Sequence, residues 1–437
     1  MTRIKKKFNF ISTRYKMSSY VGVGQNYAYE LPFASEAVPQ SFKSNQAPRV
    51  LNSVLQTVVV PSTSGQTSAG SQSVIQVPLG QNAYLTNAYL RFKVTATRAA
   101  NTNGTLFKGA AAAASALIDS SQTSINSTLI DNIMNYGFVV DQLLSHGCSA
   151  DWLSRDATVL MNAQTATAAA AAVTDTQVFC IPLIGLLGSQ QAFPLWCING
   201  VLSININWAT IARAYALSDE AGPQINAPTA LAFTELSLVY DRIAVESDFI
   251  AKMRADMASS GAKFVYNFTN YQSLTAQSTN GMNTINTGLN VSSLKNVMMS
   301  SVLTADLTST AVGSKGYSLA NGLSQFQVTL DGRLINTSIL DAVNQPAVCF
   351  VEAQKAFSRC FDASVTDIST KATYPTQSFL VAVSANRCTD GLSFTGSPCS
   401  VVGIQLAQTA NTFTNFITYV SDFSLLIDQR GSCDLVR

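Results

Sequence analysis

INGVLSININWATI, residues 198–211, is the stretch that decides the class of fold. Every second residue from 202 to 208 is large and apolar, which is the period of a β-strand with one buried face. These apolar residues are Leu202, Ile204, Ile206 and Trp208. The opposite face carries Ser203, Asn205 and Asn207, so it is polar but uncharged. The question is which kind of protein needs amides and hydroxyls there rather than lysine and glutamate.

Length and composition narrow the answer. The chain has 437 residues, of which 47% are hydrophobic and only 12% are charged. A chain of this length exceeds the size of one hydrophobic core, so two domains of roughly 200 residues each are expected. So few charges cover a free surface poorly. We therefore expect much of the uncharged polar surface to face other subunits.

Neither a membrane span nor a metal site is expected from the sequence. The longest apolar candidate, residues 178–198, is interrupted by Pro182 and Pro194 and is too broken for a spanning helix. The basic N-terminus has no apolar segment behind it, so no secretion signal is predicted and we expect the protein to be made and assembled in an intracellular compartment. Eight cysteines without a CxxC pair, together with the single histidine His146, favour reduced thiols over a zinc site.

The first 16 residues form a basic arm without an acidic residue. Its six cationic side chains are Arg3, Lys5, Lys6, Lys7, Arg14 and Lys16. Because the whole chain has a formal charge of +2, the arm's +6 leaves −4 for the remainder. Two readings stay open: a solvated tail, or an arm that binds phosphates of a nucleic acid or of anionic lipid headgroups. Met17 also offers an alternative translation start.

The rest of the chain shows short alternating segments with a few helical ones. Strand-like alternation recurs at 83–97, 229–245 and 263–272, and Asp331-Gly332 is typical of a hairpin turn. Helical spacing is predicted at 127–144, 247–261 and 345–361. The alanine-rich stretches 108–121 and 165–176 are predicted to be surface loops with a helical turn.

This pattern predicts an all-β protein made of two tandem β-sandwiches with short helical insertions. The expected division has four parts. They are a basic arm and lead-in at 1–45, an N-terminal β-sandwich at 46–247, a helical linker at 248–262 and a C-terminal β-sandwich at 263–437.

The order of motifs is similar to that of double jelly-roll major capsid proteins, in the branch of polinton-like viruses, virophages and membrane-containing phages. In the second half the resemblance rests on QVTLDGRLINTS (327–338), EAQKAFSRCF (352–361), the loop and strand at 386–409, and VSDFSLLIDQRGSCDLV (420–436). In the first half it rests on residues 181–208 followed by FTELSLVYDRIAV (233–245). It extends over nearly the whole chain beyond residue 45.

The resemblance implies that the sandwiches at 46–247 and 263–437 are two tandem jelly rolls with short helical insertions, and that the protein has a structural function. Three subunits would form a pseudo-hexagonal trimer, and trimers would tile an icosahedral virion shell beside neighbouring capsomers, penton proteins and minor capsid proteins. The basic arm would contact the genome or an internal membrane. Ser203, Asn205 and Asn207 would form an intersubunit polar face, because hydroxyls and amides pair across contacts without burying charge. The alternative for this face is an ordinary solvent-facing strand.

No catalytic, cofactor or metal site is predicted. Any triad would have to use His146, in LLSHGCSADW (143–152), which is expected to be a polar histidine in a loop. Two other functional classes stay open. One is a two-domain β-sandwich surface protein that binds a carbohydrate or a receptor. The other is a glycan-acting enzyme, which would need paired carboxylates that are scarce and scattered here.

Overall fold

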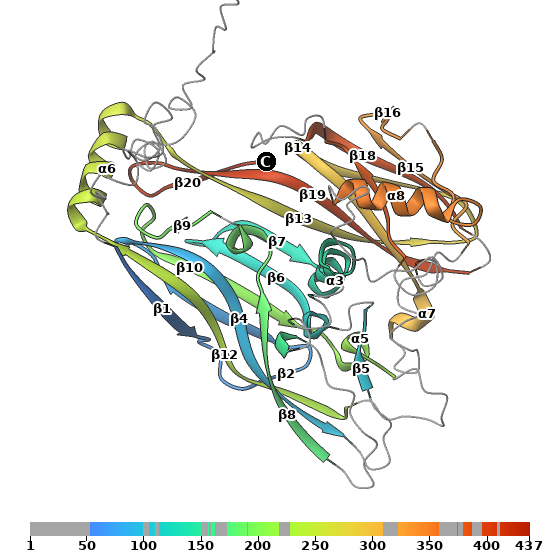
Figure 1. Ribbon diagram of the computed structural model, residues 1–437, viewed down its shortest axis with the longest axis horizontal. Helices are drawn as coiled ribbons and strands as arrows, with labels where there is room; N and C mark the ends of the chain where they lie inside the picture. Colours follow the sequence, from blue (N-terminus) through green and yellow to red (C-terminus); the bar gives the residue numbers. More distant parts are fainter. Residues whose placement is uncertain are drawn as a thin grey trace, which may run out of the picture.

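The computed structural model describes residues 53–437 apart from several gaps. The gaps are 99–104, 110–112, 150–151, 153–155, 157–158, 162–172, 190, 218–227, 309–321, 337, 358–373, 375–378, 387–395 and 409–410. In Figure 1 the first half of the chain forms one group of strands and the second half forms another beside it.

The first half contains a six-stranded sheet and a four-stranded sheet. The larger has the order β1-β12-β4-β8, with β2 on β12 and β9 on β4. Its strands are β1 (Ser53–Pro61), β2 (Thr67–Ser68), β4 (Ala83–Arg98), β8 (Val173–Pro182), β9 (Phe193–Pro194) and β12 (Ala230–Val245). The smaller has the order β3-β10-β6-β7. Its strands are β3 (Gln72–Pro78), β6 (Ile118–Ile125), β7 (Thr128–Met134) and β10 (Val201–Trp208).

These two sheets pack face to face through the apolar residues that alternate along their strands. Trp208 of β10 stacks on Phe233 of β12 with 3.9 Å between ring centroids, and it meets Phe92 of β4 edge-on at 5.0 Å. The predicted apolar face of β10 is confirmed, because Leu202, Ile204, Ile206 and Trp208 are all buried. The sandwich therefore follows from period-2 patterning on facing strands.

Short elements connect the strands of the first half. They are β5 (Thr105–Phe107) paired with β11 (Tyr215–Leu217), the 3-10 helices η2 (Ala114–Leu117) and η3 (Gly185–Gly188), and the α-helices α3 (Tyr136–Gly147) and α5 (Ile211–Ala214). The helix α6 (Ser247–Ser260) follows and leads to the second half, as predicted. It buries Ile250, Met253 and Met257, and it ends where Gly261 takes a left-handed conformation with φ +64°.

The second half forms one eight-stranded sheet that opens into two layers. Its order is β13-β19-β14-β18-β15-β16, with β17 on β14 and β20 on β19. The strands are β13 (Phe264–Ser278), β14 (Gly281–Leu303), β15 (Gln325–Leu330), β16 (Arg333–Leu334), β17 (Val381–Ser384), β18 (Ser397–Gln408), β19 (Phe413–Ile427) and β20 (Cys433–Val436). The helices are α7 (Thr304–Leu307) and α8 (Pro346–Ala356).

The opening of this sheet occurs at Leu294. From Leu294 to Leu303, β14 pairs with β19, whereas residues 281–294 pair with β18 instead. Two register shifts in β14, between Gly288 and Leu294, mark the point where the strand changes partner. Bulges of this kind bend a strand and increase its twist. Leu289 of β14, Phe326 of β15 and Phe423 of β19 are buried in the core of this half.

Two sequence-based assignments are wrong in part. Residues 127–144 were expected to be helical throughout, but 128–134 form β7 and only 136–147 form α3. Residues 108–121 were expected to be a surface loop with a helical turn. The turn is present as η2, but its residues Ala114 and Leu117 are buried rather than on the surface, and β6 starts at Ile118. Tertiary pairing overrides the helical spacing of the apolar residues at 128–134. Of the second alanine-rich stretch, 165–172 lies outside the described residues, and Val173 begins β8.

The hydrophobic core is continuous across both halves. Trp196 of the first half meets Phe264 of β13 edge-on at 5.9 Å, and Phe193 meets Tyr266 at 5.2 Å. Within the described parts of the chain, however, the two halves share no strand, because each described sheet draws its strands from one side of α6 only. On this basis we propose the division into jelly rolls at 46–247 and 263–437, with the linker at 248–262. The lead-in up to residue 52 lies outside the described residues.

Candidate functional site

The predicted polar face lies on the middle of the four-stranded sheet. Ser203, Asn205 and Asn207 alternate with the buried residues of β10, and each is half-buried. The amide Nδ2 of Asn207 donates to Ser120 Oγ on β6 at 2.7 Å. The three side chains are therefore placed on the outer side of the sandwich, as their alternation predicts.

Cross-strand neighbours extend this polar face over three strands. Ser203 lies between Gln76 and Ser124, Asn205 between Val74 and Gln122, and Asn207 between Gln72 and Ser120. We call these nine residues the polar face; it contains eight amide or hydroxyl side chains, one valine and no charged residue. Amides both donate and accept hydrogen bonds, so such a surface can pair with a copy of itself without desolvating an ion.

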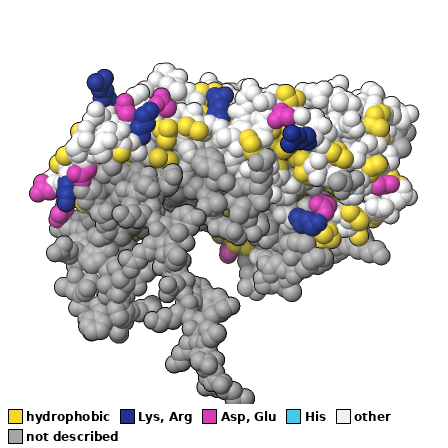
Figure 2. Space-filling model, turned by 90° about the horizontal axis from the view of Figure 1, so that it is seen from above, with side chains coloured by type: hydrophobic (Ala, Val, Ile, Leu, Met, Phe, Trp, Pro, Cys, Tyr) yellow, Lys and Arg dark blue, Asp and Glu magenta, His cyan; other side chains and the backbone are white. Residues whose placement is uncertain are grey.

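The predicted basic arm cannot be placed, because residues 1–16 lie outside the described residues. On the face drawn in Figure 2, the coloured Lys, Arg, Asp and Glu side chains are few and lie singly or in small groups of mixed charge among uncharged surface. Among the described residues, no helix is long and apolar enough to cross a membrane.

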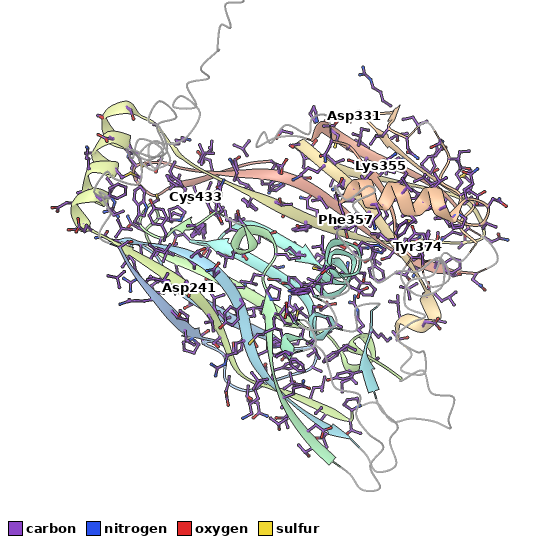
Figure 3. All side chains as sticks on the ribbon, viewed as in Figure 1. Asp241, Asp331, Lys355, Phe357, Tyr374 and Cys433 are labelled. Atoms are coloured by element: carbon purple, nitrogen blue, oxygen red, sulfur yellow. The ribbon has the colours of Figure 1, made fainter. Side chains whose placement is uncertain are left out.

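His146 is not in a loop, which corrects the prediction. It lies in the last turn of α3 and is buried, 3% exposed. Its ring stacks against Phe357, with centroids 6.0 Å apart, and meets Tyr374 edge-on at 6.3 Å. Figure 3 shows these two aromatic residues beside the end of α3. The apolar spacing of α3 extends through 146, so His146 is a core residue, and within the described chain no three His, Cys, Asp or Glu residues form a metal-binding group.

The cysteines are free thiols wherever the structure describes them. They are Cys148, Cys180, Cys197, Cys349, Cys399 and Cys433. Burial raises the pKa of Cys349 to about 12 and the pKa values of Cys399 and Cys433 to about 11. A thiol that stays protonated is a poor nucleophile. These three residues are therefore packing residues.

The contact between the halves contains polar residues that the sequence analysis did not single out. Gln142 of α3 is buried, and its Nε2 donates to Ser300 Oγ at 2.8 Å on β14. Its Oε1 accepts from Thr418 Oγ1 of β19, also at 2.8 Å. In the same helix, Phe138 stacks on Phe416 with 3.5 Å between centroids. A helix of the first jelly roll thus inserts its side chains into the sheet of the second. In the sequence, the only sign of this contact was a glutamine within the largely apolar segment GFVVDQLL (137–144).

A second buried polar cluster lies inside the second half. Ser278, Ser301, Gln408 and Asn415 are each at most 1% exposed and form a closed ring of hydrogen bonds. Asn415 donates to Ser278 at 2.8 Å, and Ser301 donates to Asn415 at 2.7 Å. Every member is satisfied by another, so the ring fixes the relative positions of β13, β14, β18 and β19.

The edge strand β1 exposes apolar residues. Val54, Leu55 and Val59 are 54%, 67% and 52% exposed, although β1 is paired along its whole length with β12. Aliphatic side chains on an edge strand favour contact with another chain. This strand is a second candidate contact surface, and its alternation is too weak in the sequence to reveal which residues remain exposed.

Comparison with known proteins gives a structural likeness only. No family model matches the sequence, and no curated protein matches it. Among solved structures, the Faustovirus major capsid protein is similar with a TM-score of 0.60 at 7% identity, covering 93% of this chain and 97% of that chain. The quasi-atomic model of the PBCV-1 virus capsid is similar with a TM-score of 0.59 at 13% identity, covering 89% of this chain and 98% of that chain. The mavirus major capsid protein is similar with a TM-score of 0.52 at 10% identity, covering 100% of this chain and 95% of that chain.

The chain has the double jelly-roll fold. The predicted fold class, two tandem jelly rolls with short helical insertions, is therefore confirmed. Identities of 7% to 13% show the fold and leave the function to be argued from the residues.

Proposed function

We propose that this chain is a structural major capsid protein, whose copies form pseudo-hexagonal trimers that tile an icosahedral virion shell. The observation that carries this proposal is the extent of the likeness. Both jelly rolls, in the same order, match capsid proteins over at least 89% of this chain and at least 95% of each of those chains. A single β-sandwich is common to many unrelated proteins, whereas a matched pair in one chain is a much more restrictive feature.

The surface chemistry supports repeated contact between like subunits. Only 12% of the residues are charged, and the polar face contains no charged residue. In this proposal Ser203, Asn205 and Asn207 lie against a neighbouring subunit or capsomer. Uncharged hydrogen-bonding groups suit such contacts, because an imperfect pairing costs less than a buried unpaired ion.

The basic arm has a separate function in this proposal. Its six cationic side chains, spread over residues 3–16, would contact the viral genome or the headgroups of an internal membrane. Penton and minor capsid proteins are the further partners that a closed icosahedral shell requires, because identical trimers alone do not fill its vertices. The protein would be assembled inside the host cell and reside in the virion capsid.

Light scattering on the purified full-length chain tests the proposal. A trimer is expected, with a mass three times the 46.6 kDa of the chain, and negative-stain images should show particles of hexagonal outline. Permanent interfaces bury more than about 2,000 Å², so the trimer should persist on dilution. A monodisperse monomer at high concentration would contradict the proposal. A monomer that also binds a glycan array would favour the alternative of a carbohydrate-binding surface protein.

A further inference from the structure

An isolated carboxyl group lies beneath the contact between the two jelly rolls. Asp131 is on β7, is 3% exposed, and shares its side of the strand with Ile133. Its Oδ2 accepts a hydrogen bond from the amide of Leu186 in η3 at 3.0 Å. Gly185, in a left-handed conformation with φ +78°, lets η3 approach so closely, since a Cβ there would collide with the carboxylate.

Leu186 connects this carboxyl group to the second jelly roll. Its carbonyl oxygen accepts a hydrogen bond from Tyr266 Oη on β13 at 3.1 Å. The same hydroxyl lies 3.1 Å from the carbonyl of Gln191, and Ser189 Oγ donates to the carbonyl of Asn267 on β13. A single peptide segment, η3 with the residues up to 191, therefore contacts Asp131 on one side and the edge of β13 on the other.

Among the described residues, no cation compensates the charge that Asp131 would carry. Burial among apolar groups raises the pKa of this carboxyl, and hydrogen bonds from the backbone amides of Leu186 and Asn132 lower it. Its Oδ1 has no hydrogen-bond partner among the described residues. The titratable groups that face it are the phenols of Tyr136 on α3 and Tyr271 on β13. Tyr271 also interacts electrostatically with the carboxyl of Asp422 on β19. Asp422 is itself paired with Lys295, at 3.2 Å.

We propose that Asp131 is a pH-sensitive element of the contact between the two jelly rolls, which is tight when the carboxyl is protonated and loosened when it is ionised. Ionisation places an unpaired negative charge among apolar groups, and the simplest relief is movement of η3 away from β7 so that water can enter. Because η3 holds the edge of β13, such movement weakens the contact between the halves. The proposal does not depend on the capsid function.

The direction of the pH dependence follows from the pKa of Asp131 in the closed form. Burial raises the pKa of Asp131 to about 7 from the ordinary 3.8. A group with a raised pKa stabilises the closed form fully below its ordinary pKa, and this stabilisation is lost as the pH rises through about 7. If the pKa of this carboxyl returns to 3.8 in the open form, the equilibrium constant for opening should rise roughly 100-fold between pH 5 and pH 8.

Hydrogen exchange measured by mass spectrometry on the full-length protein tests this. After correction for the intrinsic exchange rate, peptides covering 183–191 and 264–273 should open more readily at pH 8 than at pH 5. Peptides covering the hairpin 325–334 should not change. Wild-type protein alone suffices for this measurement, so the test does not require a variant to fold. Equal protection of 183–191 at both pH values would overturn the proposal.

Asp131→Asn provides the matched variant, since asparagine keeps the shape and cannot ionise. Its exchange at 183–191 should be independent of pH between 5 and 8. Asp248→Asn, at an exposed position in the first turn of α6, is the control and should retain the wild-type pH dependence. A pH dependence that persists in Asp131→Asn would assign the effect to another group and overturn the proposal.

Discussion

Gln142 shows how one residue can carry a contact between domains. It is buried, donates to Ser300 and accepts from Thr418, so both ends of its amide are used in the second jelly roll. A buried amide is favourable only when its partners are present, and the partners in turn are left unsatisfied if the amide is removed. This residue therefore links the position of α3 to the register of β14 and β19.

The variant Gln142→Met is expected to destabilise the protein by about 2–3 kcal/mol. Methionine preserves the volume but leaves Ser300 and Thr418 without their partner. The free energy of unfolding in urea is the measurement. Gln405→Met, at an exposed position on β18, is the control and should change stability by less than about 0.5 kcal/mol. Equal effects of the two variants would show that the amide contributes nothing beyond its volume.

At the scale of single elements, local sequence and local structure agree best at turns and caps. The hairpin between β15 and β16 turns at Asp331 and Gly332, which have φ values of 47° and 78°. This pair of positive angles is that of a type I′ turn, so the hairpin turn predicted at Asp331-Gly332 is present. The Asp331 carboxylate also accepts from the amide of Val401 at 2.9 Å and so holds the turn against β18 (Figure 3).

Gly332→Ala is expected to cost about 1 kcal/mol, because a Cβ disfavours the left-handed conformation. No atom lies within 4 Å of the Cβ position, so the cost is purely conformational. Gly288→Ala in β14 is the matched control: its surroundings are equally open and its φ is not positive. That substitution should be neutral or slightly stabilising. Thermal denaturation of both variants measures the difference. Equal melting temperatures would contradict the claim that the left-handed conformation at Gly332 disfavours a Cβ.

Elements that depend on distant contacts were predicted less well. Residues 128–134 form β7 because they pair with β6 through Ser121 and Gln122, and β7 is where Asp131 meets η3. The spacing of the apolar residues there fits a helix as well as a strand. Only the partner strand decides between the two, and a partner is not a property of the segment itself.

At the scale of the whole molecule, the two jelly rolls behave as coupled bodies. Their cores are continuous through Trp196 and Phe264, and helix α3 of the first inserts into the second. Figure 1 shows α6 at one end of this contact and α3 further along it. We therefore expect the two halves to unfold together rather than as independent domains.

Deleting residues 1–16 is expected to leave trimers intact and to impair shell assembly and binding of nucleic acid or anionic vesicles. The arm carries +6, so its binding should weaken steeply between about 50 and 200 mM salt. Light scattering measures the trimer, and co-sedimentation with nucleic acid or vesicles measures the binding. A full-length variant with all six basic residues changed to glutamine separates charge from length. Loss of the trimer on deletion would instead make the arm an interface element.

The sequence by itself determined the class of fold, the strands with clear alternation, the hairpin at 331–332 and the helix at 247–260. Each of these depends on residues close together in the chain, so its signal is local. It also indicated an uncharged face on β10, whose role as a subunit contact stays a proposal. Only the tertiary structure decided that His146 lies in the core, that Gln142 joins the two halves, and that Asp131 is buried where no described residue supplies a cation. Burial and pairing depend on what the rest of the chain brings to a side chain, and no local pattern specifies that.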